Sequence, residues 1–328
     1  MWDTTCITAS SDDIKYMESL GLHSNVETTT ANKVFYYQRG ISNAKVGTPI
    51  LVLIHGYPQT NFLWRHVVSL LPKDIPLFIP DLPGYGRSSP LSVPHSKRNV
   101  GKAILDSLHS LFGQPTDPQA IIIAGHDRGA RVCHRLAVDA DPRFDLKGSA
   151  FLDTVPGSVQ WAKFQDPAAG VGFYHWAFLA NVDLASSMIK AFGGDNYVRS
   201  SFDRWHGKNG VGTARLKENH ALDVYAKSFK YDHVIQASCD DYRAGADEDL
   251  KYEAEDQRVG RKIDSDVLVL YSAGFLGNRG NIKEIWQEWM GKGKLDAQGF
   301  GDGVGHFIAE EAPEKTAEAL HAFYKRSI

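Results

Sequence analysis

The most informative residues of the chain form a short motif in which an acidic side chain stands between two glycines. Residues 125–129 read GHDRG, which has the form Gly-x-nucleophile-x-Gly with Asp127 at its centre. The glycines permit a tight turn from a strand to a helix, and this turn lifts the central side chain out of the sheet. The helix that follows stabilises negative charge at its N-terminus. We therefore interpret Asp127 as a carboxylate nucleophile rather than a helix cap.

A carboxylate nucleophile needs a base, and His306 is the candidate. It lies in the sequence GHF at residues 305–307, just before the last expected helix. The carboxylate would attack a saturated carbon to form an ester, and the histidine would activate the water that attacks this ester. An acid must orient such a histidine. Asp153, directly after the apolar run 150–152, is the preferred acid, and Asp302 is the weaker candidate.

Two backbone N–H groups are expected to bind the oxygen that becomes negative during ester hydrolysis. Residues 55–58 read HGYP and follow the apolar run 50–54. The N–H groups of Tyr57 in this motif and of Arg128 after the nucleophile are the candidates for such an oxyanion hole. The side chains of His126 and Tyr57 are expected to line the pocket.

These motifs lie at the ends of short apolar runs that have the length of β-strands. The runs are uninterrupted rather than alternating, which is typical of strands buried on both faces of a parallel sheet. They cover residues 50–54, 77–79, 120–124, 150–152 and 267–271. Helical spacing between successive runs predicts the strand–helix alternation of an α/β fold.

The alternation stops over residues 157–263, which are rich in aromatic residues, glycine and charge. We predict several helices there: 173–180, 184–192, 196–205, 214–223 and 233–237. The expected fold is a mostly parallel, doubly wound α/β sheet with an inserted helical cap domain. Its parts are an N-terminal arm (1–25), a core (26–156 and 264–328) and the cap (157–263).

Composition excludes several other kinds of protein. The 328 residues include 36 Lys+Arg and 39 Asp+Glu, and a net charge of -3 gives no broad footprint for nucleic acid or anionic lipid. The cysteines (Cys6, Cys133, Cys239) are widely spaced, which argues against disulfides or structural zinc and favours a reducing compartment. The start of the chain lacks a signal-peptide pattern, and no apolar run approaches the ~20 residues of a membrane span. We therefore expect a cytoplasmic protein with no nucleic-acid or membrane partner.

Together, the three motifs resemble the Asp-nucleophile branch of the α/β-hydrolase superfamily, which includes haloalkane dehalogenases, haloacid dehalogenases and epoxide hydrolases. The resemblance covers residues 30–156 and 264–328, and the helical segment lies where these families carry a cap. The stretch GHDRGAR at 125–131 is most similar to the fluoroacetate dehalogenases, in which two arginines clamp the substrate carboxylate. The resemblance thus implies that Arg128 and Arg131 bind a carboxylate, for which the guanidinium fork is suited.

The same resemblance implies a halide site. In the fluoroacetate dehalogenases a His-Trp pair and a tyrosine of the cap hold the departing halide. The matching residues are His175 and Trp176, together with Tyr242 in the stretch DDYRAG at 240–245. An imidazole, an indole N–H and a phenol O–H can donate hydrogen bonds without competing negative charge.

The resemblance therefore implies hydrolytic dehalogenation of a small 2-haloacid by a homodimer that needs neither cofactor nor metal. Two alternatives stay open. An epoxide hydrolase would use the same Asp127, His306 and Asp153, with Tyr242 and Tyr174 protonating the opening oxygen, but would leave the arginines without a role. A repurposed member of the fold would act on a non-halogenated substrate or bind a ligand.

Overall fold

The chain folds around an eight-stranded sheet in the order β1-β2-β4-β3-β5-β6-β7-β8. The structure is a computed structural model, and it describes residues 11–29, 32–44, 47–112 and 117–328. The strands are β1 (His23–Thr28), β2 (Lys33–Arg39), β3 (Ile50–Ile54), β4 (Leu77–Pro80), β5 (Gln119–His126), β6 (Phe144–Leu152), β7 (Asp266–Ser272) and β8 (Leu295–Phe300). Strands β4, β3, β5, β6, β7 and β8 are parallel, whereas β1 and β2 are antiparallel to their neighbours.

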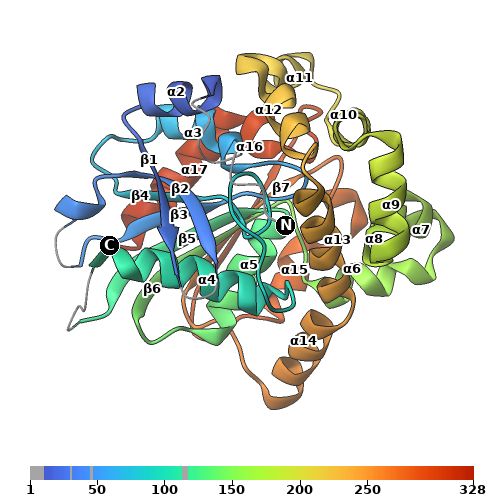
Figure 1. Cartoon of the computed structure of the whole chain (residues 1–328). Helices are drawn as coiled ribbons and strands as arrows, with labels where there is room; N and C mark the ends of the chain where they lie inside the picture. The colour runs from blue at the N-terminus through green and yellow to red at the C-terminus, as the bar shows by residue number, and fades with distance from the viewer. Residues whose placement is uncertain (1–10, 30–31, 45–46, 113–116) are drawn as a thin grey trace.

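The apolar runs form the buried centre of this sheet. All five residues of β3 are buried, and seven of the eight in β5 are buried. Helices cover both faces, as Figure 1 shows, with α4 and α5 in front of the strands and α17 behind them. The core helices are α2 (Asp12–Ser19), α3 (Arg65–Leu70), α4 (Lys97–His109), α5 (Arg128–Asp139), α15 (Ile282–Gln287), α16 (Ile308–Glu311) and α17 (Pro313–Arg326). The predicted α/β-hydrolase architecture with a mostly parallel sheet is confirmed.

The segment between β6 and β7 is helical, and we call residues 157–263 the helical insertion. Its α-helices are α6 (Gly157–Ala162), α7 (Pro167–Gly172), α8 (Tyr174–Ala180), α9 (Val182–Phe192), α10 (Gly194–Trp205), α11 (Gly210–Lys217), α12 (Ala221–Ser228), α13 (Asp232–Ala246) and α14 (Glu248–Val259). They lie along one side of the sheet, on the right in Figure 1. In the described ranges, no helix is both long and apolar enough to cross a membrane.

The structure corrects two boundaries. The range predicted as an N-terminal arm, 1–25, includes the first residues of β1, which begins at His23; residues 1–10 lie outside the described ranges. The polar, half-exposed sequence of β1 hides this edge strand. The single helix predicted over 214–223 is two helices, since Asn219 and His220 adopt left-handed backbone conformations between α11 and α12.

Candidate active site

The turn that carries Asp127 is sharp, as the two glycines require. Strand β5 ends at His126 and α5 begins at Arg128, and Asp127 between them has a φ of 50°. A Cβ on Gly129 would lie 2.3 Å from the carbonyl oxygen of His55. A Cβ on Gly125 would lie 2.4 Å from the backbone of Gly129. Only glycine fits at either position, so the motif holds Asp127 in its strained conformation.

The two carboxylate oxygens of Asp127 have different surroundings. Oδ1 accepts a hydrogen bond from the backbone N–H of Tyr57 at 3.0 Å, as expected for an oxyanion hole. Oδ2 lies 3.8 Å from Nε2 of His306 and is the oxygen left to attack a substrate. Burial alone would raise the pKa of Asp127, but the positive charges of His306 and the nearby arginines lower it below 3.8. The carboxylate of Asp127 is therefore ionised at neutral pH.

His306 is oriented by the predicted acid. Its Nδ1 lies 2.7 Å from Oδ2 of Asp153, which leaves Nε2 facing the nucleophile. Oδ1 of Asp153 accepts hydrogen bonds from the N–H and the hydroxyl of Ser272, at 2.8 and 2.7 Å. Burial would lower the pKa of His306, but the hydrogen bond to Asp153 and the negative charges of Asp153 and Asp127 raise it above 6.5. Asp302 lies at the surface and pairs with Lys315 instead.

A cavity of about 40 Å³ lies beside the nucleophile and the base. It brings together side chains from the ends of the core strands and from the helical insertion. The lining residues are Tyr57, Asp127, Arg131, Asp153, Thr154, Val155, Gln160, Phe173, His175, Trp176, Trp205, Tyr242, Phe275, Leu276 and His306. All three residues expected at a halide site are among them. In the described part of the chain, no group of three or more His, Cys, Asp or Glu side chains could hold a metal ion.

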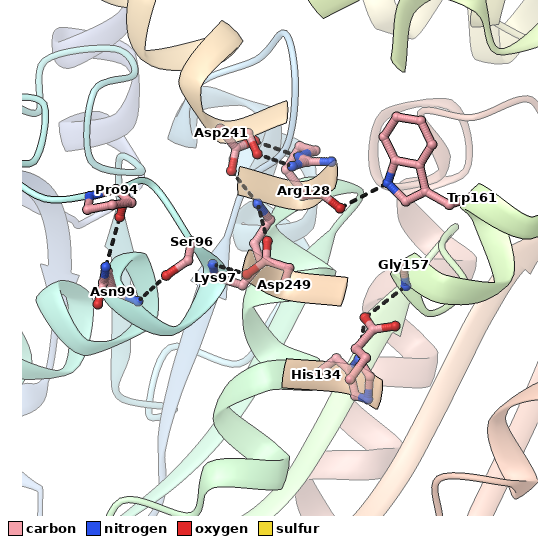
Figure 2. A network of polar contacts seen from close by, with 12 residues as sticks. Pro94, Ser96, Lys97, Asn99, Arg128, His134, Gly157, Trp161, Asp241 and Asp249 are labelled. Carbon is pink, nitrogen blue, oxygen red and sulfur yellow. Dashed lines mark hydrogen bonds and ion pairs between the residues drawn. The ribbon is translucent and has the colours of Figure 1, made fainter. Parts of the chain in front are cut away.

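Arg128 does not reach this cavity, contrary to the expected two-arginine clamp. Its Nε donates to Oδ2 of Asp241 at 2.5 Å, and its Nη2 donates to the Asp241 carbonyl at 2.8 Å (Figure 2). Lys97 of α4 binds the other oxygen of the same carboxylate. The guanidinium also stacks on Tyr242, with its Cζ 4.1 Å from the ring centre. Arg128 thus joins the core to α13 and has few donors left for a ligand.

Arg131, one helical turn further on, has no such carboxylate. Its Nε and Nη1 are buried and lack a hydrogen-bond partner among the described residues. The guanidinium stacks on Trp176, with Cζ 4.5 Å from the ring centre. Burial and the charge of Arg128 lower the pKa of Arg131 to about 10, so it is still a cation at neutral pH. A buried cation without a partner is costly, and an anion in the cavity would relieve that cost.

His126 does not line the pocket either, although its place in the motif predicts that it does. The side chain is fully buried, and Nε2 lies 2.8 Å from the backbone carbonyl of His306. Burial lowers the pKa of His126 to about 4, so the ring is neutral. It supports the loop of the base from behind.

Another supporting residue escaped the sequence analysis. The carboxylate of Glu311 accepts the N–H groups of Gly305 and Phe307, at 2.9 and 3.1 Å, on both sides of His306. It also accepts the N–H of Gly207 from the helical insertion, at 2.8 Å. Glu311 therefore links the loop that carries His306 to the core and to the helical insertion. The sequence offers no signal for this role, because Glu311 reads as one of several acidic residues near α17.

The chain is similar to known proteins over most of its length. The family model described as "Alpha/beta hydrolase family" matches residues 51–319. A fluoroacetate dehalogenase from Burkholderia sp. is 27% identical over 277 residues, which cover 84% of this chain and 86% of that protein. A soluble epoxide hydrolase from Corynebacterium sp. (strain C12) is 26% identical over 298 residues, which cover 88% and 94%.

Two solved structures are similar over nearly their whole length. One, from Nostoc sp. PCC 7120, is provisionally described as an alpha/beta hydrolase; it is 32% identical, with a TM-score of 0.76, and the match covers 92% of this chain and 97% of that one. The other, from Pseudomonas aeruginosa, is a variant of a provisionally described epoxide hydrolase with bound MFA. It is 28% identical, with a TM-score of 0.77 and coverages of 94% and 98%.

The region that the family model matches contains strands β4 to β8, most of β3, and the residues Asp127, Asp153 and His306. Its named relatives are hydrolases that act on small molecules. The chain is therefore a hydrolase, and it belongs to the alpha/beta hydrolase family.

Proposed function

We propose that this enzyme hydrolyses the carbon–halogen bond of a small 2-haloacid such as fluoroacetate. The observation that carries the proposal is the unpaired, buried guanidinium of Arg131, which shares one cavity with the Asp127 carboxylate. A cation placed beside an anionic nucleophile suits a substrate that is itself anionic. The small volume of the cavity suits a substrate of few atoms, and the dehalogenase from Burkholderia sp. supports this substrate class.

In the first step, Arg131 binds the substrate carboxylate and Asp127 attacks the neighbouring carbon. A bond forms between Oδ2 of Asp127 and this carbon, while the carbon–halogen bond breaks and the halide leaves with the bonding electron pair. We propose that His175, Trp176 and Tyr242 receive the halide. Burial lowers the pKa of His175 to about 3, so its ring is neutral and still offers one N–H donor.

In the second step, Nε2 of His306 takes a proton from water, and the water oxygen attacks the carboxyl carbon of the Asp127 ester. The negative charge that develops on Oδ1 is stabilised by the N–H of Tyr57, which already binds this oxygen. We propose that the N–H of Arg128 assists. The ester then breaks and releases a 2-hydroxy acid that carries Oδ2, while the water oxygen stays in Asp127. His306 returns its proton to the alkoxide oxygen of the product, and the second proton of the water leaves the Asp127 carboxyl group for solvent, which regenerates the carboxylate.

Halide release from fluoroacetate and chloroacetate, followed with an ion-selective electrode, tests the proposal. The wild type should release halide, and Asp127→Asn should not. A single turnover in ¹⁸O-labelled water should place the label in Asp127, because the ester forms there. Diol formation from small epoxides without any halide release would overturn the proposal.

The epoxide hydrolase is the second candidate, favoured by the phenol of Tyr242 in the cavity and by the relative from Corynebacterium sp.. Its expected second acid, Tyr174, is 41% exposed and is not among the residues that line the cavity. His175 occupies the cavity wall instead. The absence of Tyr174 from the lining of the cavity, together with the cation of Arg131, makes this the weaker candidate. If the enzyme converts neither haloacids nor epoxides, we would conclude that it is a repurposed member of the fold with a non-halogenated substrate.

We further propose that the helical insertion acts as a cap over the nucleophile, and that the enzyme works in the cytoplasm as a homodimer. The first part rests on the cavity, whose wall contains Gln160, His175, Trp176 and Tyr242 of the insertion. Light scattering coupled to size-exclusion chromatography tests the dimer, and a mass of one chain would contradict it.

A further inference from the structure

We propose that Gln160 is the second hydrogen-bond donor to the substrate carboxylate, in the place that sequence similarity assigns to Arg128. This inference rests on the proposed function, since it concerns how the same acid is bound. It follows from three features of the described residues. The amide nitrogen of Gln160 has no partner, helix α6 is hydrogen-bonded near both of its ends, and one tryptophan contacts both α6 and Arg131.

The amide nitrogen of Gln160 is buried in the wall of the cavity and has no hydrogen-bond partner among the described residues. Gln160 lies on α6, is 2% exposed and lines the cavity. Burying an amide without a partner costs free energy, so such groups normally find one. The remaining partner is a water or a ligand in the cavity, and a carboxylate that displaces the water would accept this hydrogen bond.

The helix that carries Gln160 is held in place on both sides of it. At the start of α6, the Glu253 carboxylate accepts the N–H groups of Gly157 and Ser158, at 2.9 and 2.7 Å. Next to Gln160, the indole N–H of Trp161 donates to the carbonyl of Gly245 on α13 at 2.9 Å. Figure 2 shows both anchors, from Gly157 and from Trp161. The backbone that carries the Gln160 side chain is therefore held in a fixed position beside the cavity.

A tryptophan between them places α6 near Arg131. Trp176 contacts Trp161 edge-on, with ring centres 5.5 Å apart, and Arg131 stacks on the same Trp176. Thus α6 and the unpaired guanidinium flank one indole in one small cavity. A carboxylate has two oxygens, and one guanidinium and one amide can serve them both.

The binding experiment uses Asp127→Asn as the background, because this variant binds without turnover. Titration calorimetry with chloroacetate should give a Kd about tenfold higher when Gln160→Met is added, since a hydrogen bond to a charged group is lost. Gln165→Met is the matched control, because Gln165 is exposed near the same helix; it should leave Kd unchanged. An unchanged Kd in the Gln160→Met variant would overturn the inference.

The turnover experiment separates this inference from the proposed function. Gln160→Glu brings a negative charge next to the substrate carboxylate, so kcat/KM for chloroacetate should fall more than tenfold relative to kcat/KM for the neutral chloroacetamide. This ratio does not depend on the fraction of enzyme that is folded. An unchanged ratio alongside halide release by the wild type refutes the role of Gln160 alone. No halide release by the wild type, with the calorimetric difference intact, refutes dehalogenation but keeps the carboxylate site.

Discussion

Two sets of side chains meet at the cavity, and they differ in whether their polar atoms have hydrogen-bond partners. On the core side, Asp127, His306 and Asp153 contact one another or the backbone, and the further oxygens of Asp153 and Glu311 are also bound. By contrast, buried nitrogens without a partner among the described residues belong to Arg131 of α5 and to Gln160 and His175 of the helical insertion. A saturated network keeps a fixed geometry for bond making. Unsaturated donors mark the places where a ligand completes the structure.

Two arginines on α5 show the same contrast within a single turn of helix. Arg128 is held by Asp241, and the charge of that carboxylate raises its pKa despite the burial that opposes it. For Arg131, burial and its cationic neighbour lower the pKa instead. Residues of the same type, three positions apart, thus differ: one is paired within the protein, and the other is the residue proposed to bind the substrate.

The largest effect is expected from Asp127→Asn, which removes the proposed nucleophile. Loss of a central member of such a catalytic set lowers kcat on the order of ten-thousand-fold. The electrode assay measures this directly, and circular dichroism checks that the variant is folded. Residual turnover within tenfold of the wild type would mean that another group attacks the substrate.

The next effect separates the two chemical steps. In His306→Gln, Asp127 is still present to form the ester, but no base activates water, so hydrolysis should fall between about 10²- and 10⁴-fold. One halide per active site should then be released in a burst, and mass spectrometry should find the protein heavier by the acid fragment. Halide release without a stable mass increase would contradict this order of steps.

Separate substitutions of Arg128 and Arg131 test whether one arginine stabilises the fold and the other binds the substrate. Arg131→Met should raise Kd for a haloacid about a hundredfold, because truncating one partner of a buried charge pair costs about 2–5 kcal/mol. The variant should be at least as stable as the wild type, since it removes an unpaired buried cation. Arg128→Met should instead lower the free energy of unfolding by about 3–5 kcal/mol, because it breaks the buried pair with Asp241. Calorimetry and urea unfolding measure both quantities, and equal stability of the two variants would remove the distinction.

The smallest effect concerns pH. His306 acts as a base when neutral, so ester hydrolysis falls as pH drops through its pKa, which lies above 6.5 in the free enzyme. Ester formation neutralises Asp127, one of the charges that raise this pKa. The rate of ester hydrolysis, measured after the halide burst, should therefore decline at acidic pH with an apparent pKa. This apparent pKa should be lower than the pKa of His306 that NMR measures in the free enzyme. An equal or higher apparent pKa would mean that Asp127 does not affect the base.

Much of the active-site geometry was predictable because its signals are local. The sharp turn at Asp127 is predictable because it requires glycine at two nearby positions of the same motif. Asp153 directly follows strand β6, and His306 lies two residues before helix α16. Strand β8 and helix α14 were missed for the complementary reason. The sequence LDAQGF of β8 is only partly apolar, and α14 is a highly charged helix without a clear apolar face.

The sequence by itself determined the fold class, the nucleophile candidate and the residue types available to the pocket, because periodicity and turn chemistry act over a few residues. Only the tertiary structure decided which of these side chains still have donors to spare. Arg128 and Asp241 are 113 residues apart, His126 and His306 are 180 apart, and the anchors of α6 come from α13 and α14. Electrostatic pairing depends on distance in space, so the partner of a buried charge is settled when the helical insertion packs on the core.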